Sequence, residues 1–167
     1  MTKRLSLLCL LFCTCVVQAQ KSINYQLFVN SFCDNREYFN TVQYPQTIFG
    51  TRLSPTITLH TDSAQSFTLG INALREFGAA HNGLFGQVDP IAYYKYDKKP
   101  FYFSMGSFPR MGTIDDYPRA LLTDTLNYYR PNVEGMLVKI HGKWGHETLF
   151  IDWTSRQTNT ARETFMY

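Results

Sequence analysis

The sequence lacks the motifs that usually identify an enzyme or a cofactor-binding protein. It has no glycine-rich phosphate loop, no His-Glu-x-x-His, no Gly-x-Ser-x-Gly and no Cys-x-x-Cys. His141 and His146 flank one turn, but no third ligand is in view, and zinc requires three or four. We therefore expect no catalytic residue, no metal site, no cofactor and no enzymatic activity.

Cysteine is scarce, and the positive and negative charges are nearly balanced. Cys9, Cys13 and Cys15 lie in the first 19 residues, so Cys33 stands alone in the rest of the chain. A lone cysteine cannot form an intramolecular disulfide, and we expect Cys33 to be a small buried apolar side chain. The 16 basic and 13 acidic residues form no basic stripe, so no nucleic-acid partner is predicted.

The one long hydrophobic run is N-terminal, and it is too short for a membrane-spanning helix. Basic residues precede the apolar stretch Leu5–Val17, which ends in the cleavage-site pattern Val17-Gln18-Ala19. This order is typical of a secretion signal. We predict a signal peptide over residues 1–19, removed by ordinary cleavage rather than lipid attachment, and a single domain over residues 20–167.

The chain is rich in aromatic residues and contains stretches in which apolar and polar residues alternate strictly. Aromatic content is 16%, which favours strands. Between Phe49 and Phe77, Leu53, Ile57 and Leu69 belong to apolar series whose members alternate with polar residues, so each arm has one apolar face. Two such arms joined by a polar turn predict a β-hairpin. Each arm has about 12 residues, and a transmembrane strand needs about 9–11.

Similar patterns predict seven strands and the connections between them. The strands are Ile23–Cys33, Phe49–His60, Ser66–Phe77, Pro90–Tyr96, Phe101–Phe108, Val133–His141 and Glu147–Ser155. Long connections (34–48, 78–89, 109–132) alternate with short turns (61–65, 97–100, 142–145), as they do in outer-membrane barrels. Helical periodicity is weak, apart from one turn around Arg119–Leu126.

These features predict an all-β fold: an antiparallel up-and-down meander of long amphipathic strands forming a partial transmembrane β-barrel. Single-chain bacterial barrels have an even number of strands. The stub Arg162–Tyr167 is too short to close the barrel, so we expect the chain to be the front part of a longer one. We expect Ile23–Cys33 and Glu147–Ser155 to be free edges that do not pair with each other.

Four stretches carry a resemblance to a known class of protein. They are Asn35–Phe39 with Gln46–Pro55, Ser107–Arg110, Tyr128–Gly135, and Asp152–Gln157 followed by Arg162-Glu163. Together they resemble the N-terminal part of porin-like outer-membrane proteins of the Bacteroidetes type. The resemblance implies an exported protein of the bacterial outer membrane, in contact with its lipid. The resemblance does not identify a substrate; our first hypothesis is passive or selective passage of small solutes, with glycans among the candidates.

Polar residues on an outward-apolar barrel are predicted to line the pore or its loops. The candidates are Arg52, Arg75, Asp152, Thr154 and Arg156 in or beside strands, and Arg110, Asp115, Asp116, Arg119 and Arg130 in the long connection 109–132. Opposed charges on a loop that folds inward set a local field that selects solutes. The alternative is a solvated loop whose charges pair locally.

A soluble secreted β-sandwich that binds or hydrolyses glycans is the competing interpretation. Its carboxylates show no spacing that selects a catalytic pair. Burial separates the two hypotheses, because in a barrel nine side chains should lie exposed on the outside: Leu53, Ile57, Leu59, Phe67, Leu69, Ile71, Leu149, Ile151 and Trp153. A barrel should also gather outward-facing rings beside one turn, drawn from Tyr93, Tyr94, Tyr96, Phe101, Tyr102, Phe103 and Trp144.

Overall fold

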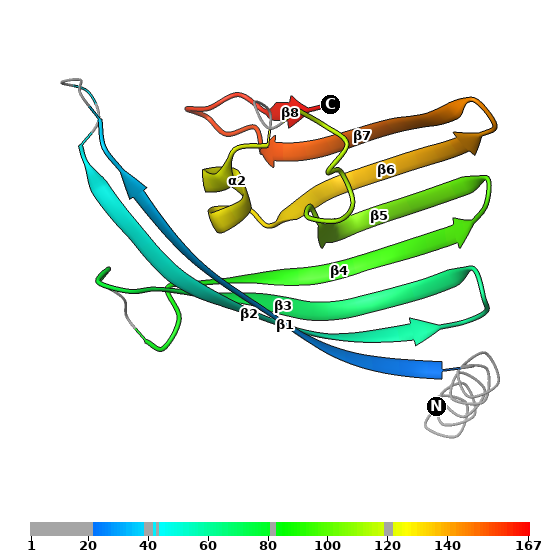
Figure 1. Ribbon diagram of the computed structural model, residues 1–167, viewed down its shortest axis with the longest axis horizontal. Coiled ribbons are helices and arrows are strands. Elements are labelled where there is room, and N and C mark those ends of the chain that lie inside the picture. Colours follow the sequence, from blue (N-terminus) through cyan, green and yellow to red (C-terminus); the bar gives the residue numbers. More distant parts are fainter. Residues whose placement is uncertain (1–21, 39–41, 43, 81–82, 119–121) are drawn as a thin grey trace, which may run out of the picture.

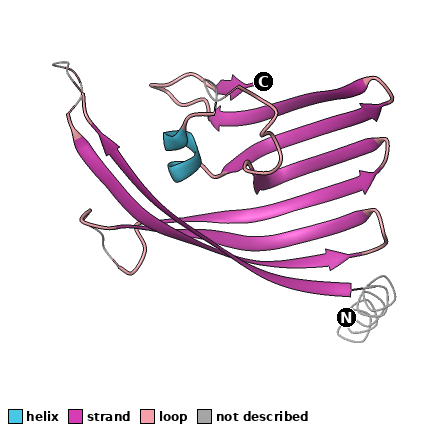
Figure 2. Ribbon diagram, viewed as in Figure 1, coloured by secondary structure: helices cyan, strands magenta, loops and turns pink. Residues whose placement is uncertain are grey.

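The computed structural model is a meander of eight antiparallel strands in one curved sheet (Figures 1 and 2). It describes residues 22–38, 42, 44–80, 83–118 and 122–167, so the predicted signal peptide lies outside the described part. The elements are β1 (Ser22–Arg36), β2 (Gln46–His60), β3 (Gln65–Glu76), β4 (Gln87–Lys98), β5 (Phe101–Pro109), α2 (Asp124–Tyr129), β6 (Asn132–Gly142), β7 (Gly145–Ser155) and β8 (Thr164–Met166). The predicted all-β class is confirmed.

Every strand pairs with its neighbours in sequence, and the sheet does not close on itself. Among the described residues β1 pairs with β2 alone, as expected for a free edge. The expectation for the other edge was wrong, because β8 pairs with the end of β7 at Asp152, Trp153 and Ser155. The predicted stub Arg162–Tyr167 contains β8, so the last residues of β7 are paired. That the chain is part of a longer barrel stays a prediction.

The two faces of the sheet differ in chemistry. We call the face that carries residues 110–118 and 122–131 the inner face, and the other the outer face. Of the nine side chains predicted on the outside, Ile57, Phe67, Leu69, Ile71, Leu149, Ile151 and Trp153 are exposed, and Leu53 and Leu59 are half-buried. No second sheet packs on them in the described part of the chain. The sandwich interpretation is therefore wrong.

Aromatic rings gather on the outer face beside the β4–β5 turn. Tyr94 lies 5.0 Å from Phe67 and 6.3 Å from Phe103, and Tyr96 lies 6.0 Å from Phe101, measured between ring centroids. Two other predicted rings, Tyr93 and Tyr102, pack instead against the inner core, and Trp144 is fully exposed in its turn. The outward-facing rings form one cluster, as an interfacial girdle requires.

A second group of outward rings lies at the other end of the sheet. Phe49 contacts Phe77 with centroids 4.8 Å apart, and Trp153 contacts Phe165 at 5.1 Å. Both pairs sit near the long connections, whereas the first cluster sits near the short turns (Figure 1). An apolar band flanked by two groups of rings is the pattern of a strand wall that faces lipid.

Cys33 is exposed, so its predicted burial was wrong. It pairs with Phe49, and facing residues on antiparallel strands project to the same side. Cys33 therefore belongs to the outer face, where an apolar side chain does not need burial in protein.

The core lies on the inner face, where the described residues 110–118 and 122–131 fold back against the sheet. We call this stretch the infolded segment. Ile114 and Leu122 pack with side chains of β5, β6 and β7 in one buried cluster. Tyr128 and Tyr129 pack on a second cluster formed by β1, β2 and β3, where Tyr128 stacks on Phe32 with centroids 4.1 Å apart. The segment therefore spans the hollow of the sheet and contacts both sides of it.

The short helix α2 is capped at both ends. Thr123 caps the first turn by accepting a hydrogen bond from the Leu126 amide at 3.3 Å. The Arg130 amide donates to the Leu126 carbonyl at 2.7 Å and closes the last turn. The sequence predicts one helical turn around 119–126, and the helix lies slightly later, at 124–129. In the described part of the chain, no helix is both long and apolar enough to cross a membrane.

Candidate functional site

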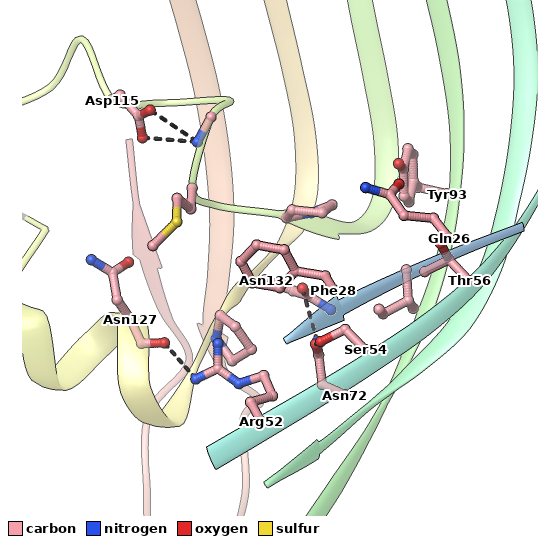
Figure 3. A pocket seen from close by; sticks show the side chains of 15 residues that line it. Gln26, Phe28, Arg52, Ser54, Thr56, Asn72, Tyr93, Asp115, Asn127 and Asn132 are labelled. Atoms are coloured by element: carbon pink, nitrogen blue, oxygen red, sulfur yellow. Dashed lines mark hydrogen bonds between the residues drawn. The ribbon is translucent and has the colours of Figure 1, made fainter. Parts of the chain in front are cut away.

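A pocket of about 370 Å³ lies between the infolded segment and the inner face of β1 to β4 (Figure 3). Its walls combine apolar side chains with amides, hydroxyls, one guanidinium and one carboxylate. The lining residues are Gln26, Phe28, Arg52, Ser54, Thr56, Asn72, Ile91, Tyr93, Pro109, Met111, Gly112, Asp115, Asn127, Pro131 and Asn132. This mixture suits a ligand that has both a polar and an apolar part.

Arg52 holds the floor of the pocket together. It projects from the inner face of β2, is only 5% exposed, and donates through Nη2 to the carbonyls of Asn127 (2.7 Å) and Tyr128. These carbonyls belong to α2, which leaves them unpaired near its C-terminal end. A buried guanidinium on backbone carbonyls is a charge-assisted contact, and it fixes α2 relative to β2.

A chain of polar side chains crosses the pocket wall from β2 to β6. The Ser54 hydroxyl donates to Asn72 Oδ1 at 2.6 Å, and Asn72 Nδ2 donates to Asn132 Oδ1 at 3.0 Å. All three side chains are buried. Their mutual hydrogen bonds offset the cost of removing them from water, and they make this part of the wall rigid.

Asp115 brings the carboxylate to the opposite side of the pocket (Figure 3). Its two oxygens accept from the Gly112 amide at 2.9 and 3.0 Å. Gly112 has a φ of +80°, a conformation that a residue with a side chain adopts only with strain, so this glycine makes the tight turn possible. Among the described lining residues, Asp115 is the one with an acidic side chain.

The next residue, Asp116, faces β6 and β7 instead. It accepts from Lys139 Nζ at 3.0 Å and lies 3.4 Å from His146 Nε2. The hydrogen bond and charge of Lys139 hold the pKa of the Asp116 carboxyl below its usual value. Beside it, the Tyr117 hydroxyl donates to the Thr148 carbonyl at 2.8 Å, and burial raises the pKa of Tyr117. These contacts attach the tip of the infolded segment to the sheet.

A buried ion pair anchors the start of the infolded segment. Arg110 Nη2 lies 2.5 Å from Asp152 Oδ2, and both side chains are at most 1% exposed. Arg110 also donates to the carbonyls of Asn132 (2.9 Å) and Arg130 (3.2 Å), while Asp152 Oδ1 accepts from the Glu134 amide at 2.9 Å. Buried charges persist only with partners of this kind. Asp152 therefore points inward from β7 and holds the start of the infolded segment against the sheet.

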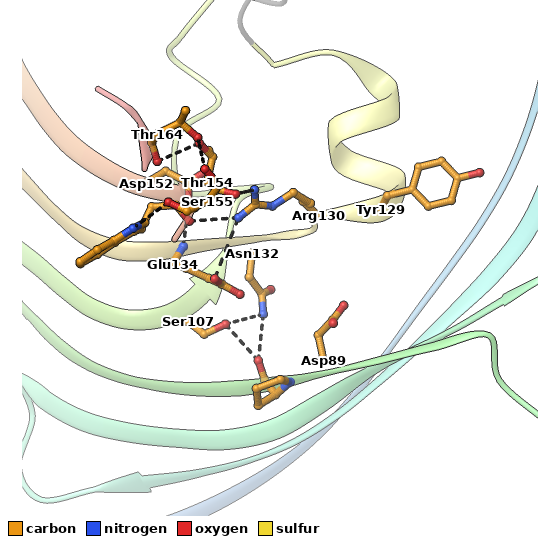
Figure 4. A network of polar contacts seen from close by, with 12 residues as sticks. Asp89, Ser107, Tyr129, Arg130, Asn132, Glu134, Asp152, Thr154, Ser155 and Thr164 are labelled. Atoms are coloured by element: carbon orange, nitrogen blue, oxygen red, sulfur yellow. Dashed lines mark hydrogen bonds and ion pairs between the residues drawn. The ribbon is translucent and has the colours of Figure 1, made fainter. Parts of the chain in front are cut away.

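A second hollow, of about 220 Å³, adjoins the first, and Figure 4 shows the polar contacts of Arg130 and Asn132 beside it. It is lined by Gln87, Asp89, Tyr129, Arg130, Pro131, Asn132 and Glu134, so the two hollows share Pro131 and Asn132. Arg130 lies at its edge, donating to the carbonyls of Trp153 (3.1 Å) and Thr154. Its contact with the exposed Glu134 carboxylate is longer, at 3.9 Å.

The predicted site residues do not share one location. Arg52 and Asp115 line the first hollow, Arg130 lines the second, and Arg110 is paired with Asp152. Asp116 pairs with Lys139, Arg75 donates to the Gly83 and Leu84 carbonyls, Thr154 bonds with Thr164, and Arg156 is exposed beyond β7. Arg119 lies outside the described residues.

Sequence reasoning missed most of the pocket lining. Ser54, Thr56 and Asn72 lie on the polar parity of the hairpin formed by β2 and β3, so the alternation alone could have identified them as inward-facing. Asn127 and Asn132 carry no such signal, because their positions depend on how the infolded segment folds.

The chemistry available in the pocket is acid–base and hydrogen-bonding chemistry. Tyr93, Gln26 and Thr56 bring hydrogen-bond donors to the walls, and Asp115 brings a proton acceptor. No histidine is among the described lining residues. Nor does the part of the chain that the structure describes contain a group of three or more His, Cys, Asp or Glu side chains able to hold a metal ion.

Comparison with known proteins identifies a family. A family model described as "Lipid A 3'-O-deacylase-type" matches residues 16–167. Searches against curated proteins and against solved structures gave no match. The family match corrects four expectations from the sequence: the porin-like resemblance, the passage of solutes, the glycan alternative and the absence of enzymatic activity were wrong. They failed because long amphipathic strands are common to pores and to barrels that carry enzymes, and the periodicity cannot separate the two.

Proposed function

Because this chain belongs to the lipid A 3'-O-deacylase-type family, we propose that it is an outer-membrane enzyme that hydrolyses an acyl ester of lipid A. The observation that carries the proposal is the family match, which extends over residues 16–167 and so includes every strand of the sheet. Association with the outer membrane follows from the family. Export through a cleaved signal peptide over residues 1–19 remains part of the proposal.

The outer face supports a position within a lipid layer. Exposed apolar side chains such as Leu27, Leu69 and Leu149 run along the strands, between the two groups of aromatic rings. In water such a surface would be unfavourable, whereas in hydrocarbon it costs nothing. In outer-membrane barrels the long connections face outward. The infolded segment would then hang from the rim nearest the outer leaflet, where lipid A resides.

The pocket supports the reaction class. Ester hydrolysis adds water to the acyl carbonyl and expels the sugar alcohol, so it needs a group that accepts a proton from water and donors for the oxyanion. In our proposal Asp115 accepts the proton from the attacking water and returns it to the departing alkoxide. The Tyr93 hydroxyl and the Gln26 amide, which also line the pocket, donate to the oxyanion. The products are a fatty acid and a sugar hydroxyl.

The test is hydrolysis by the whole chain, folded into phospholipid vesicles that contain lipid A. Mass spectrometry should show a released fatty acid and lipid A lighter by one acyl group. Asp115→Asn should reduce the rate by about 10²–10⁴-fold, the usual contribution of a general base. Asp97→Asn, at an exposed carboxyl near the end of β4, is the matched control and should leave the rate unchanged.

Two results would count against the proposal. A folded wild-type chain that releases no fatty acid contradicts the activity. A wild-type rate in Asp115→Asn contradicts the assignment of the reaction to this pocket.

A further inference from the structure

Strands β4 and β5 separate before they reach the end of the sheet that carries the long connections. Their pairing runs from Lys98–Phe101 to Ala92–Ser107 and then stops. In the described register, residues 87–91 of β4 pair with β3 but have no partner on β5. We call this opening the β4–β5 split. The described registers also leave Ser54 and Pro55 of β2 without partners on β3, and residues 132–134 of β6 without partners on β7. The β4–β5 split is the gap that adjoins the second hollow.

The sequence accounts for the split. Extending the Ala92–Ser107 register by two residues places Pro90 opposite Pro109. Neither proline has an amide N–H, so this pair cannot continue the ladder, and prolines inside a sheet are confined to such breaks. Just before it, Gly106 has a φ of +119°, and a Cβ there would lie 2.2 Å from the Ala92 carbonyl. The backbone of β5 therefore turns away where only glycine permits it.

Side chains replace the missing ladder bonds. The Ser107 hydroxyl donates to the Pro90 carbonyl at 3.0 Å, and Asn132 Nδ2 donates to Ser107 Oγ at 2.9 Å and to the same carbonyl at 3.4 Å (Figure 4). In hydrocarbon an unsatisfied backbone group costs several kcal/mol. A side-chain replacement of this kind keeps the split stable, and it leaves polar groups in the wall.

The split connects the outside of the sheet with the pocket. The 220 Å³ hollow lies at the split and shares Pro131 and Asn132 with the 370 Å³ pocket. At its outer mouth the Glu134 side chain is 56% exposed and the Arg130 side chain 33% exposed. Arg130 donates to the carbonyl of Trp153, whose ring belongs to the outward aromatic group near the long connections. The mouth is therefore at the level expected for lipid headgroups.

We propose that an acylated glycolipid reaches the pocket sideways from the outer leaflet, through the β4–β5 split. Its polar head lies among Arg130, Glu134 and Asn132, and its acyl ester extends past Asn132 into the pocket. This inference rests on the proposed function for the identity of the substrate. It adds the route, which spares the lipid from leaving the membrane before it is cleaved.

The experiment places a bulky label at the mouth of the split after the protein has folded. In a background in which the four native cysteines are serine, Glu134→Cys is folded into vesicles and then labelled with a bulky maleimide, so the label cannot disturb folding. The matched control is Glu147→Cys, an exposed glutamate on β7 next to the short β6–β7 turn. Labelled and unlabelled forms of each variant are compared.

Two substrates separate the route from the reaction: lipid A embedded in the vesicles, and the water-soluble ester p-nitrophenyl butyrate. At position 134 the label should slow lipid A hydrolysis at least tenfold and change hydrolysis of the soluble ester less than twofold. At position 147 it should affect neither. A lipid A rate unchanged by the label at 134, or an equal loss with both substrates, overturns the proposal.

A second measurement does not depend on hydrolysis. The alkylation rate of the thiol introduced by Glu134→Cys is compared in vesicles with and without lipid A. Occupation of the split should slow this rate at least fivefold, while the thiol introduced by Glu147→Cys reacts as before. Protection without any hydrolysis would support the route and refute the proposed activity. Equal alkylation rates would refute the route even in an active enzyme.

Discussion

The ion pair between Arg110 and Asp152 should be the contact whose loss costs the most stability. Asp152→Asn leaves the Arg110 guanidinium buried, at 1% exposure, without a countercharge. Its Nη1 already has no hydrogen-bond partner among the described atoms. Breaking one side of a buried pair costs about 3–5 kcal/mol. We expect the free energy of unfolding to fall by that amount, which corresponds to about 10²–10⁴ in the folded-to-unfolded ratio.

The assay is urea unfolding of the chain in lipid vesicles, followed by tryptophan fluorescence. Asp116→Asn is the matched control, because it removes the same charge from a pair whose carboxylate side chain is 46% exposed. Exposed pairs contribute about 1 kcal/mol or less. The double variant Arg110→Met/Asp152→Asn completes a cycle and should lose at least about 2 kcal/mol less than the sum of its single variants.

The reasoning would be refuted by either of two results. A loss below about 1 kcal/mol for Asp152→Asn, the size expected of an exposed pair, would show that water or a relaxed backbone satisfies Arg110. Additive single variants would show that the two side chains act independently, despite the 2.5 Å contact.

Three further predictions address strain, titration and the lipid-facing wall. Gly106→Ala should destabilise the fold by about 1–3 kcal/mol in the same urea assay, because φ is +119° and the new Cβ meets the Ala92 carbonyl; an unchanged midpoint would contradict this. Burial and the hydrogen bond to Glu76 raise the pKa of Tyr129 to about 12. The stability contributed by the protonated Tyr129 hydroxyl is complete below about pH 10, the ordinary tyrosine pKa, and is lost as the pH rises towards about 12. When tyrosinate absorbance is followed against pH, Tyr129→Phe should remove a titration near pH 12. Leu149→Arg, on the outer face, should cost about 2–4 kcal/mol in vesicles, and a neutral effect would argue against contact with lipid.

The strands could be predicted from the sequence because their signal is local. Leu69 and Ile71 lie two residues apart, and the same period that predicts a strand also predicts which side faces out. Their exposure follows from that period alone. Strand ends were less accurate: β2 begins at Gln46 rather than Phe49, because pairing with β1 extends it through residues that have no clear alternation.

The infolded segment could not be predicted in the same way, because its contacts are not periodic. Arg52 binds a carbonyl 75 residues away, and Arg110 binds Asp152 at a separation of 42. The alternation places Arg52 on the polar parity of its strand and Arg75 on the apolar parity of the next, but it gives no sign of the α2 carbonyls that Arg52 binds. The function was mistaken for a related reason. The features that were recognised report the membrane setting, and the reaction depends on side chains brought together by this segment.

The infolded segment also determines the order in which the protein can fold. It follows β5 in the chain, yet it binds β2 through Arg52 and β7 through Asp152 and Thr148, so it cannot dock until strands on both sides of it are in place. The hairpins β2–β3, β4–β5 and β6–β7 close over short turns, whereas the contacts of the infolded segment close long loops and are slower to form. Docking should therefore be the last kinetic step, occurring after the sheet has assembled. A newly inserted chain would pass through a state with a complete strand wall and no pocket, so catalytic competence should lag behind membrane insertion.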